Sequence, residues 1–222
     1  MNTVITGANR GLGLEFARQC RDRGDTVFAG CRDPQSAGDL NALAGDRLRV
    51  VRLDVADGDS VREAAAAVGG PVGLLVNNAG VYGTHRDAPQ TVADTSAETF
   101  EDVYRVNVVG PLRVTQAFAG RLTAESVVLN VSSGYGSIEH AGGDWPAAYC
   151  CSKAALNMLS RIAAAELSCR VVPISPGWVR TDMGGPGADL SPRESVAGML
   201  RAAADPDASG RFLRYDGDTV PW

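Results

Sequence analysis

The length, composition and charge of this chain exclude several classes of protein. It has 222 residues, of which 45% are hydrophobic and 21% are charged, close to the averages for globular proteins, so neither a disordered nor a fibrous chain is indicated. The formal net charge of -5 at pH 7 provides no diffuse positive field for phosphate backbones, which argues against a nucleic-acid partner. The length favours a single domain over 1–222.

The N-terminal residues lead directly into a glycine turn, without the basic and apolar regions of a secretory signal. No apolar run reaches the length of about 18 residues that a membrane-spanning helix needs. We therefore expect a cytoplasmic protein with no membrane partner. The five cysteines lack the spacing of a zinc site or of a disulfide framework, so no metal site is predicted.

In chain order, short apolar runs alternate with segments of helical periodicity. Strands are predicted over 3–6, 26–29, 48–53, 73–77, 126–131, 170–174 and 211–215. Helices are predicted over 12–23, weakly between 34 and 48, and over 60–68, 99–122, 148–167 and 192–204. Strict alternation with strands that are apolar along their length predicts an α/β, doubly wound Rossmann fold, with a seven-stranded parallel sheet and helices on both faces. The longest irregular segments, 81–95, 134–147 and 184–191, follow carboxyl ends of strands, where such sheets bind ligands.

A glycine-rich turn connects the first predicted strand to the first helix. It reads Thr6-Gly7-Ala8-Asn9-Arg10-Gly11-Leu12-Gly13. Glycines at such a place let the backbone approach a pyrophosphate at the helix N-terminus. A plain structural turn is the alternative, but the strand, turn and helix context favours phosphate binding. The Gly-x-x-x-Gly-x-Gly spacing resembles that of the short-chain dehydrogenase/reductase family.

Further motifs of this family follow in order on the expected elements. They are Asp54-Val55, Asn77-Asn78-Ala79-Gly80, Asn107, Ser132-Ser133, Tyr149-Cys150-Cys151-Ser152-Lys153 and Pro176-Gly177-Trp178-Val179-Arg180-Thr181. The resemblance implies a nicotinamide cofactor held by Gly7, Asn9, Arg10, Gly11, Leu12, Gly13, Arg32, Asp54, Val55, Asn78, Ala79, Gly80, Tyr149, Lys153, Pro176, Gly177, Val179 and Thr181.

Tyr149 and Lys153 are four residues apart, so a helix places them side by side on one face. Lys153 is the only lysine among 21 basic residues, which suggests a position where arginine would not serve. A nearby ammonium favours the phenolate, so we expect Lys153 to lower the pKa of Tyr149 toward the value a general acid/base needs. The resemblance further implies that Ser133, with Ser132 as the alternative, orients a substrate carbonyl, and that Asn107 holds a water of a proton relay.

The charge at the end of the second strand indicates which nicotinamide cofactor is used. The segment reads Gly30-Cys31-Arg32-Asp33, and an arginine there attracts the 2′-phosphate of NADP, whereas an acid would favour NAD. Arg10 in the glycine turn is placed to approach the same phosphate from the other side. We therefore predict NADP(H) as the cofactor, and Asp33 leaves NAD(H) as the alternative.

Together these motifs predict an oxidoreductase that transfers a hydride between NADP(H) and the carbonyl carbon of an aldehyde, ketone or quinone, or the corresponding alcohol. Few residues separate Met183 from the next helix, so the lid over the substrate should be small. Candidate pocket residues from the three long loops are Tyr82, His85, Tyr135, Ile138, His140, Trp145, Trp178 and Met183. Their aromatic character indicates a bulky or aromatic small-molecule substrate.

The small lid and the ending Tyr215-Asp216-Gly217 with Pro221-Trp222 are most similar to the C-factor and sniffer-like carbonyl reductases. C-factor is described as a signalling protein, so signalling, or NADP-binding regulation without chemistry, is the alternative function. The complete set of Ser, Tyr, Lys and Asn favours turnover. We also expect a homodimer or homotetramer, formed through apolar residues on the two long helices. The candidates are Phe100, Tyr104, Leu112, Leu156 and Leu159.

Overall fold

The alternating apolar strands form one parallel sheet. The computed structural model describes residues 1–83 and 90–222. The strands are β1 (Asn2–Thr6), β2 (Thr26–Cys31), β3 (Leu48–Arg52), β4 (Val72–Asn77), β5 (Val127–Val131), β6 (Arg170–Ser175) and β7 (Leu213–Arg214). Within the described residues they make a seven-stranded sheet in the order β3-β2-β1-β4-β5-β6-β7, and every pair is parallel. The predicted Rossmann-type architecture is confirmed.

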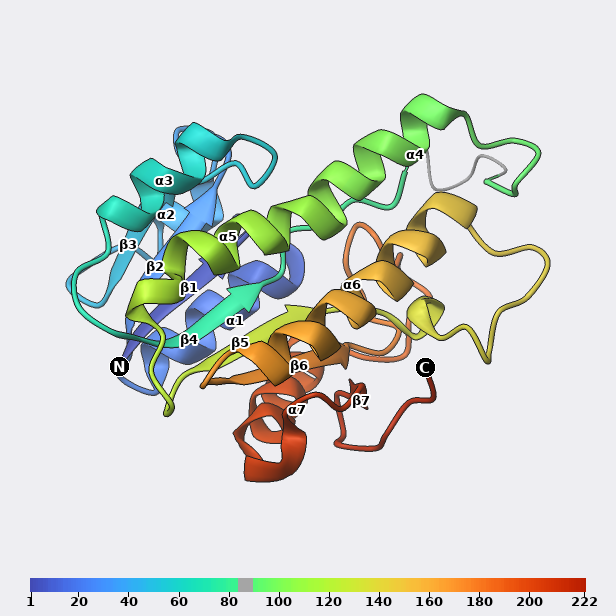
Figure 1. The fold of residues 1–222 in the computed structure, drawn as a ribbon. Coiled ribbons are helices and arrows are strands. Elements are labelled where there is room, and N and C mark those ends of the chain that lie inside the picture. Colours follow the sequence, from blue (N-terminus) through green and yellow to red (C-terminus); the bar gives the residue numbers. More distant parts are fainter. Residues whose placement is uncertain (84–89) are drawn as a thin grey trace.

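Helices cover both faces of this sheet (Figure 1). They are α1 (Gly11–Asp22), α2 (Gly38–Asn41), α3 (Gly58–Ala66), α4 (Ala97–Tyr104), α5 (Gly110–Phe118), α6 (Ala147–Glu166) and α7 (Pro192–Ala204). On one face, Phe16 of α1 and Met199 of α7 are fully buried in the same apolar cluster. On the other face, Val61 of α3 and Phe118 of α5 belong to a second cluster. The strands are therefore buried from both sides, which is why they are apolar along their length.

The long helix predicted over 99–122 is interrupted. Helix α4 passes into a π-helical turn, Arg105–Val109, before α5 begins at Gly110. Pro111 has no N–H and cannot donate to the carbonyl of Asn107 as an unbroken α-helix requires. Gly110 also packs closely on the chain after β3, since a Cβ there would lie 2.9 Å from the Cβ of Val55. The interruption turns Asn107 inward, where it is fully buried.

The last predicted strand, over 211–215, is reduced to the two residues of β7. The side chain of Arg214 pairs with both Asp216 and Asp218, and Leu213 forms an antiparallel bridge with Thr219. The chain therefore folds back on itself directly after β7, and these local contacts end the strand early.

Only part of the apolar surface expected at an oligomer interface is available. Leu156 is 1% exposed and packs inside the chain, so its assignment to an interface is wrong. Leu112 is 37% exposed, and Met158 and Ile162, which the sequence analysis did not select, are 62% and 46% exposed on α6. Residues three or four apart on a helix point to the same side, so the outer surface of α6, not its sheet-facing surface, carries the free apolar groups.

Candidate active site

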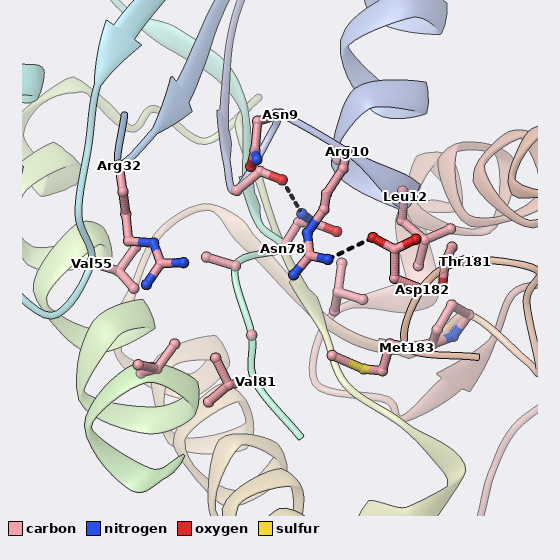
Figure 2. Close-up of a pocket in the computed structure, with 18 of the residues that line it drawn as sticks. Asn9, Arg10, Leu12, Arg32, Val55, Asn78, Val81, Thr181, Asp182 and Met183 are labelled. Atoms are coloured by element: carbon pink, nitrogen blue, oxygen red, sulfur yellow. Dashed lines mark hydrogen bonds and ion pairs between the residues drawn. The ribbon is translucent and has the colours of Figure 1, made fainter. Parts of the chain in front are cut away.

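A cleft lies at the carboxyl edge of the sheet, beside the point where the strand order reverses between β1 and β4. Most of the predicted cofactor residues line it. They are Gly7, Asn9, Arg10, Gly11, Leu12, Gly13, Arg32, Asp54, Val55, Asn78, Ala79, Gly80, Tyr149, Lys153, Pro176 and Thr181. Figure 2 shows side chains from the glycine turn, the ends of several strands and the loop after β6 gathered around this one cleft.

The glycine turn is held by the end of β4. The side-chain amide of Asn78 donates to the carbonyl oxygens of Thr6 at 2.9 Å and Gly7 at 3.1 Å. The backbone amides of Asn78 and Ala79 in turn donate to the Thr6 hydroxyl, each at 3.0 Å. Gly7 has φ +64°, and a Cβ on Gly13 would lie 2.1 Å from the Gly7 carbonyl oxygen. Positions 7 and 13 therefore cannot carry a side chain, and the backbone at the start of α1 is left uncovered at these two positions.

Two arginines lie at the rim of the cleft. Arg32 follows β2, is exposed, and within the described residues makes no hydrogen bond or ion pair. Arg10 forms an ion pair with Asp182 from the loop after β6, with a distance of 2.6 Å between Nη1 and Oδ2. Figure 2 shows this pair, with the Arg32 side chain on the far side of Arg10 from Asp182. The sequence analysis missed Asp182.

Tyr149 and Lys153 stand side by side near the start of α6. The Lys153 Nζ atom lies 5.5 Å from the centroid of the Tyr149 ring and donates to the Val131 carbonyl oxygen at 2.8 Å. Burial lowers the pKa of Lys153 to about 8. Burial also raises the pKa of Tyr149 above its ordinary value, and a hydrogen bond with the Ser133 side chain acts in the opposite direction. The pKa of Tyr149 is therefore raised and not lowered as expected, because burial outweighs the hydrogen bond with Ser133.

The two serines after β5 have different surroundings. Ser132 is 1% exposed, and its hydroxyl donates to Asn157 Oδ1 on α6 at 2.6 Å. Ser133 is half-buried and hydrogen-bonds with Tyr149. Of the pair, Ser132 is among the residues lining the cleft, and Ser133 lies beside the Tyr149 hydroxyl instead. The Ser132 hydroxyl is therefore engaged with α6, whereas the Ser133 hydroxyl is next to Tyr149.

Asn107 does not line the cleft but supports it from behind. Its Oδ1 accepts from the Val81 amide at 2.9 Å, and its Nδ2 donates to the Val81 carbonyl at 2.8 Å and to the Ser152 hydroxyl at 3.0 Å. A Cβ on Gly80 would lie 3.6 Å from Lys153 Nζ and 3.3 Å from Asn107 Oδ1. Asn107 thus fixes the chain after β4 against the helix that carries Tyr149 and Lys153.

The motif after β6 divides into residues that face the cleft and residues that shape the turn. Pro176 and Thr181 line the cleft, whereas Gly177 and Val179 do not. Gly177 has φ +76°, and a Cβ there would lie 2.6 Å from Leu190. Val179 is 4% exposed and its backbone is bridged to Leu190. The structure gives both residues a role in the shape of the loop.

An aromatic wall stands next to Tyr149. The Tyr82 ring centroid is 4.9 Å from that of Tyr149, and the Tyr135 ring is 4.6 Å from Trp145 and 6.3 Å from Tyr149. These three side chains are among the predicted pocket residues. Of the other candidates, Ile138, Trp178 and Met183 are 74%, 52% and 40% exposed, His140 is exposed, and Met183 lines the cleft. His85 lies outside the described residues.

Several lining residues were missed from the sequence. They are Leu53, Ala56, Val81, Val106, Val131 and Asp182. Ser132 and Met183 also line the cleft, although they were predicted only as a substrate-orienting alternative and as a substrate-pocket residue. Most flank a selected motif by one or two positions, so the carboxyl end of each predicted strand was the available signal. Val106 precedes Asn107 and lies in the π-helical turn.

Comparison with known proteins decides the family. The family model described as short chain dehydrogenase matches residues 1–189. The chain belongs to the short-chain dehydrogenase family. This short-chain dehydrogenase is 41% identical to C-signal of Myxococcus xanthus over 160 residues, which cover 69% of this chain and 94% of C-signal.

Solved structures support the same assignment over the whole length of this oxidoreductase. The NADPH-bound carbonyl reductase from chicken fatty liver is 35% identical, with a TM-score of 0.91 over 100% of this chain and 98% of that one. The carbonyl reductase Sniffer of D. melanogaster is 27% identical, with a TM-score of 0.91 over 100% of both chains. The expected family and its carbonyl reductase-like relatives are confirmed.

Two further features concern residues 1–83 and 90–222. No helix there is both long and apolar enough to cross a membrane. No cluster of His, Cys, Asp and Glu side chains there has the grouping of a metal site.

Proposed function

We propose that this short-chain dehydrogenase reduces the carbonyl group of a small molecule with NADPH, or oxidises the corresponding alcohol with NADP. The observation that carries the proposal is the environment of Tyr149. Its side chain is buried, hydrogen-bonds with Ser133, has Lys153 beside its ring and lines the cleft. The NADPH-bound carbonyl reductase of chicken fatty liver, with the same fold over the whole chain, supports this choice.

The residues of the cleft fit a dinucleotide. Helix α1 begins after Arg10, which provides no side-chain cap, so the first amides of α1 are left for an anion. The absence of side chains at Gly7 and Gly13 allows close approach to those amides. The positive dipole end of the helix and the two rim arginines add favourable charge for phosphate groups.

The rim also favours NADP over NAD. Arg32 lines the cleft, whereas Asp33 does not. The Asp33 carboxylate accepts from the backbone amide of Gln35 at 3.0 Å. A hydrogen bond with the Ser36 side chain and this bond with Gln35 lower the pKa of Asp33. Asp33 is thus engaged in its own turn, and a cation stands where a 2′-phosphate is expected. NAD(H) remains the alternative in the test below.

In reduction, NADPH would supply the hydride, and the chain would supply the proton and the alignment. The raised pKa keeps the Tyr149 hydroxyl protonated at neutral pH, so it can donate its proton to the carbonyl oxygen as negative charge develops there. Ser133 would share that oxygen as a second hydrogen-bond donor. Lys153, with a pKa of about 8, can hold or release a proton near the working pH. Asn107 would keep Val81 and the helix of Tyr149 in register and serve the expected proton relay.

The aromatic wall indicates the kind of substrate. Tyr82 and Tyr135 contact the Tyr149 ring, Trp145 packs on Tyr135, and offset or edge contacts between aromatic rings are favourable. We propose that the substrate is a bulky or aromatic aldehyde, ketone or quinone.

The test is a panel of aldehydes, quinones and bulky ketones, with consumption of NADPH or NADH as the signal. We expect turnover with NADPH by the parent protein, and its loss in Tyr149→Phe with NADPH binding retained, because only the proton donor is removed. Tyr104→Phe is a matched control, since Tyr104 stacks on Phe100 and does not line the cleft. Full turnover by Tyr149→Phe contradicts the mechanism.

A second candidate function is favoured by the similarity to C-signal of Myxococcus xanthus. In this case the protein would act as a signalling or NADP-binding regulatory protein. The same panel separates the two. A protein that binds NADPH in calorimetry but turns over none of the carbonyl compounds supports the regulatory function, whereas Tyr149-dependent turnover supports the enzyme.

A further inference from the structure

We propose that Asn157 is a positioning residue that holds Ser133 at the correct place relative to Tyr149. The inference rests on the proposed function, because it concerns the hydroxyl that would share the substrate oxygen with Tyr149. Asn157 follows Tyr149 by eight residues and Lys153 by four on α6, so all three lie along one side of the helix. Its side chain is 2% exposed and lies outside the set that lines the cleft.

Asn157 makes two hydrogen bonds that bracket Ser133. Its Oδ1 accepts from the Ser132 hydroxyl at 2.6 Å, and its Nδ2 donates to the Gly136 carbonyl oxygen at 3.1 Å. Ser132 precedes Ser133, and Gly136 ends the 3-10 turn Gly134–Gly136 that follows it. One buried amide therefore ties both ends of the serine segment to the helix that carries Tyr149.

Ser133 itself is bound to this turn through both its backbone and its side chain. Its carbonyl oxygen accepts from the Gly136 amide at 2.8 Å, and its hydroxyl oxygen accepts from the Tyr135 amide at 3.2 Å. The backbone amide of the preceding residue, Ser132, still donates to the carbonyl oxygen of Ile174 in β6 at 2.7 Å. The sheet thus fixes the chain up to Ser132, and beyond that point the placement of Ser133 depends on where the turn docks.

The docking surface on α6 requires a glycine at the end of the turn. A Cβ on Gly136 would lie 2.8 Å from Asn157 Nδ2, 2.9 Å from the Lys153 carbonyl carbon and 3.0 Å from the Lys153 carbonyl oxygen. Backbone atoms cannot move aside as the end of a flexible side chain can. The glycine allows the turn to approach the helix closely enough for the Asn157 amide to reach its carbonyl.

Helix α6 also contacts the two preceding residues of β5. Ser160 accepts from Asn130 at 2.8 Å, and Lys153 donates to the Val131 carbonyl at 2.8 Å. Helix α6 (Figure 1) therefore hydrogen-bonds with three successive residues. Ser160 bonds with Asn130, Lys153 with Val131 and Asn157 with Ser132. Ser160 is a suitable control because it is buried on the same helix and its hydroxyl bonds to Asn130 of β5 and to the Leu156 carbonyl, not to the serine turn.

The test uses the substrate that gives the best turnover in the panel. We expect Asn157→Ala to lower kcat by about tenfold or more, because a small misplacement of an aligned group costs this much. The dissociation constant of NADPH should stay near the parent value. Ser160→Ala should lose stability in urea unfolding but keep kcat. Gly136→Ala displaces the same turn from the other side and should reproduce the loss of kcat, which keeps the test valid if Asn157→Ala does not fold.

The decisive measurement is a double-mutant cycle with Ser133→Ala. If Asn157 acts through Ser133, Asn157→Ala should cause little further loss of kcat once the Ser133 hydroxyl is gone. A loss of the same size in both backgrounds, or a folded Asn157→Ala protein with the parent kcat, overturns the inference. If Ser133→Ala loses turnover but Asn157→Ala and Gly136→Ala keep the parent kcat, the inference about Asn157 is overturned and the proposed function stands. If the parent protein turns over no compound of the panel, the proposed function itself is overturned.

Discussion

The buried ammonium of Lys153 should make the stability of the protein depend on pH in a way that one substitution removes. The folded-state pKa of Lys153 is lowered by burial from 10.5 to about 8. Between these two values the unfolded chain holds the proton and the folded chain does not, so the free energy of unfolding rises with pH. At about 1.4 kcal/mol for each pKa unit, the lysine contributes a rise of about 1 kcal/mol between pH 7 and pH 9.

The perturbation is Lys153→Met, which keeps an unbranched apolar chain but carries no charge. Its free energy of unfolding, relative to the parent, should fall by about 1 kcal/mol from pH 7 to pH 9, because only the parent gains stability. The thiols of Cys20, which is buried, and of Cys150, which is partly buried, have pKa values raised to about 12 and act in the opposite direction. Because the pKa of these thiols is higher in the folded state than in the unfolded state, their contribution to stability is lost as the pH rises above the unfolded-state value. This contribution is the same in the parent and in Lys153→Met, so it cancels in the difference between them.

The assay is urea unfolding followed by tryptophan fluorescence at both pH values, with the midpoint and slope fitted for each protein. Tyr149→Phe is the control, because the hydroxyl of Tyr149 stays protonated over this range in the folded state, where burial raises its pKa, and almost entirely so in the unfolded state, where its pKa is about 10. It should therefore keep the pH dependence of the parent. A difference between parent and Lys153→Met that is the same at pH 7 and pH 9 would refute the reasoning, and with it the idea that Lys153 can exchange a proton near neutral pH.

Three further predictions concern the cofactor and the assembly. Arg32→Ala should weaken NADPH binding in calorimetry by roughly tenfold to a hundredfold and NADH binding little, since a charge-assisted phosphate contact is removed; equal losses for both cofactors contradict this role. Asp182→Asn should tighten NADPH binding a few-fold, because it frees Arg10 from an exposed ion pair and removes a negative charge from the cleft; weaker binding would show that the pair closes over the cofactor instead. Light scattering should give at least a dimer of the 23.1 kDa chain, with Met158→Glu on the exposed side of α6 shifting it toward monomer, and a monomeric parent at all concentrations rules this out.

The features that could be predicted from the sequence are those carried by short stretches of chain. The apolar strands and the helical periodicity predicted the parallel sheet, because burial on both faces leaves a local pattern. The glycine turn and the four-residue interval between Tyr149 and Lys153 are also local, since backbone freedom and helix geometry determine them. Sixteen of the eighteen predicted cofactor residues line one cleft for the same reason: each follows or lies near the carboxyl end of a strand.

The tertiary structure decided what depends on contacts between distant parts of the chain. The pairing of Arg10 with Asp182, the support of the glycine turn by Asn78 and the hold of Asn157 on the serine turn join segments that no local pattern connects. Burial, which only packing establishes, also reversed the expected direction for the pKa of Tyr149. The sequence determined which groups are present and on which elements they lie, whereas packing determined their solvation and their partners, because both depend on residues that are adjacent in space and remote along the chain.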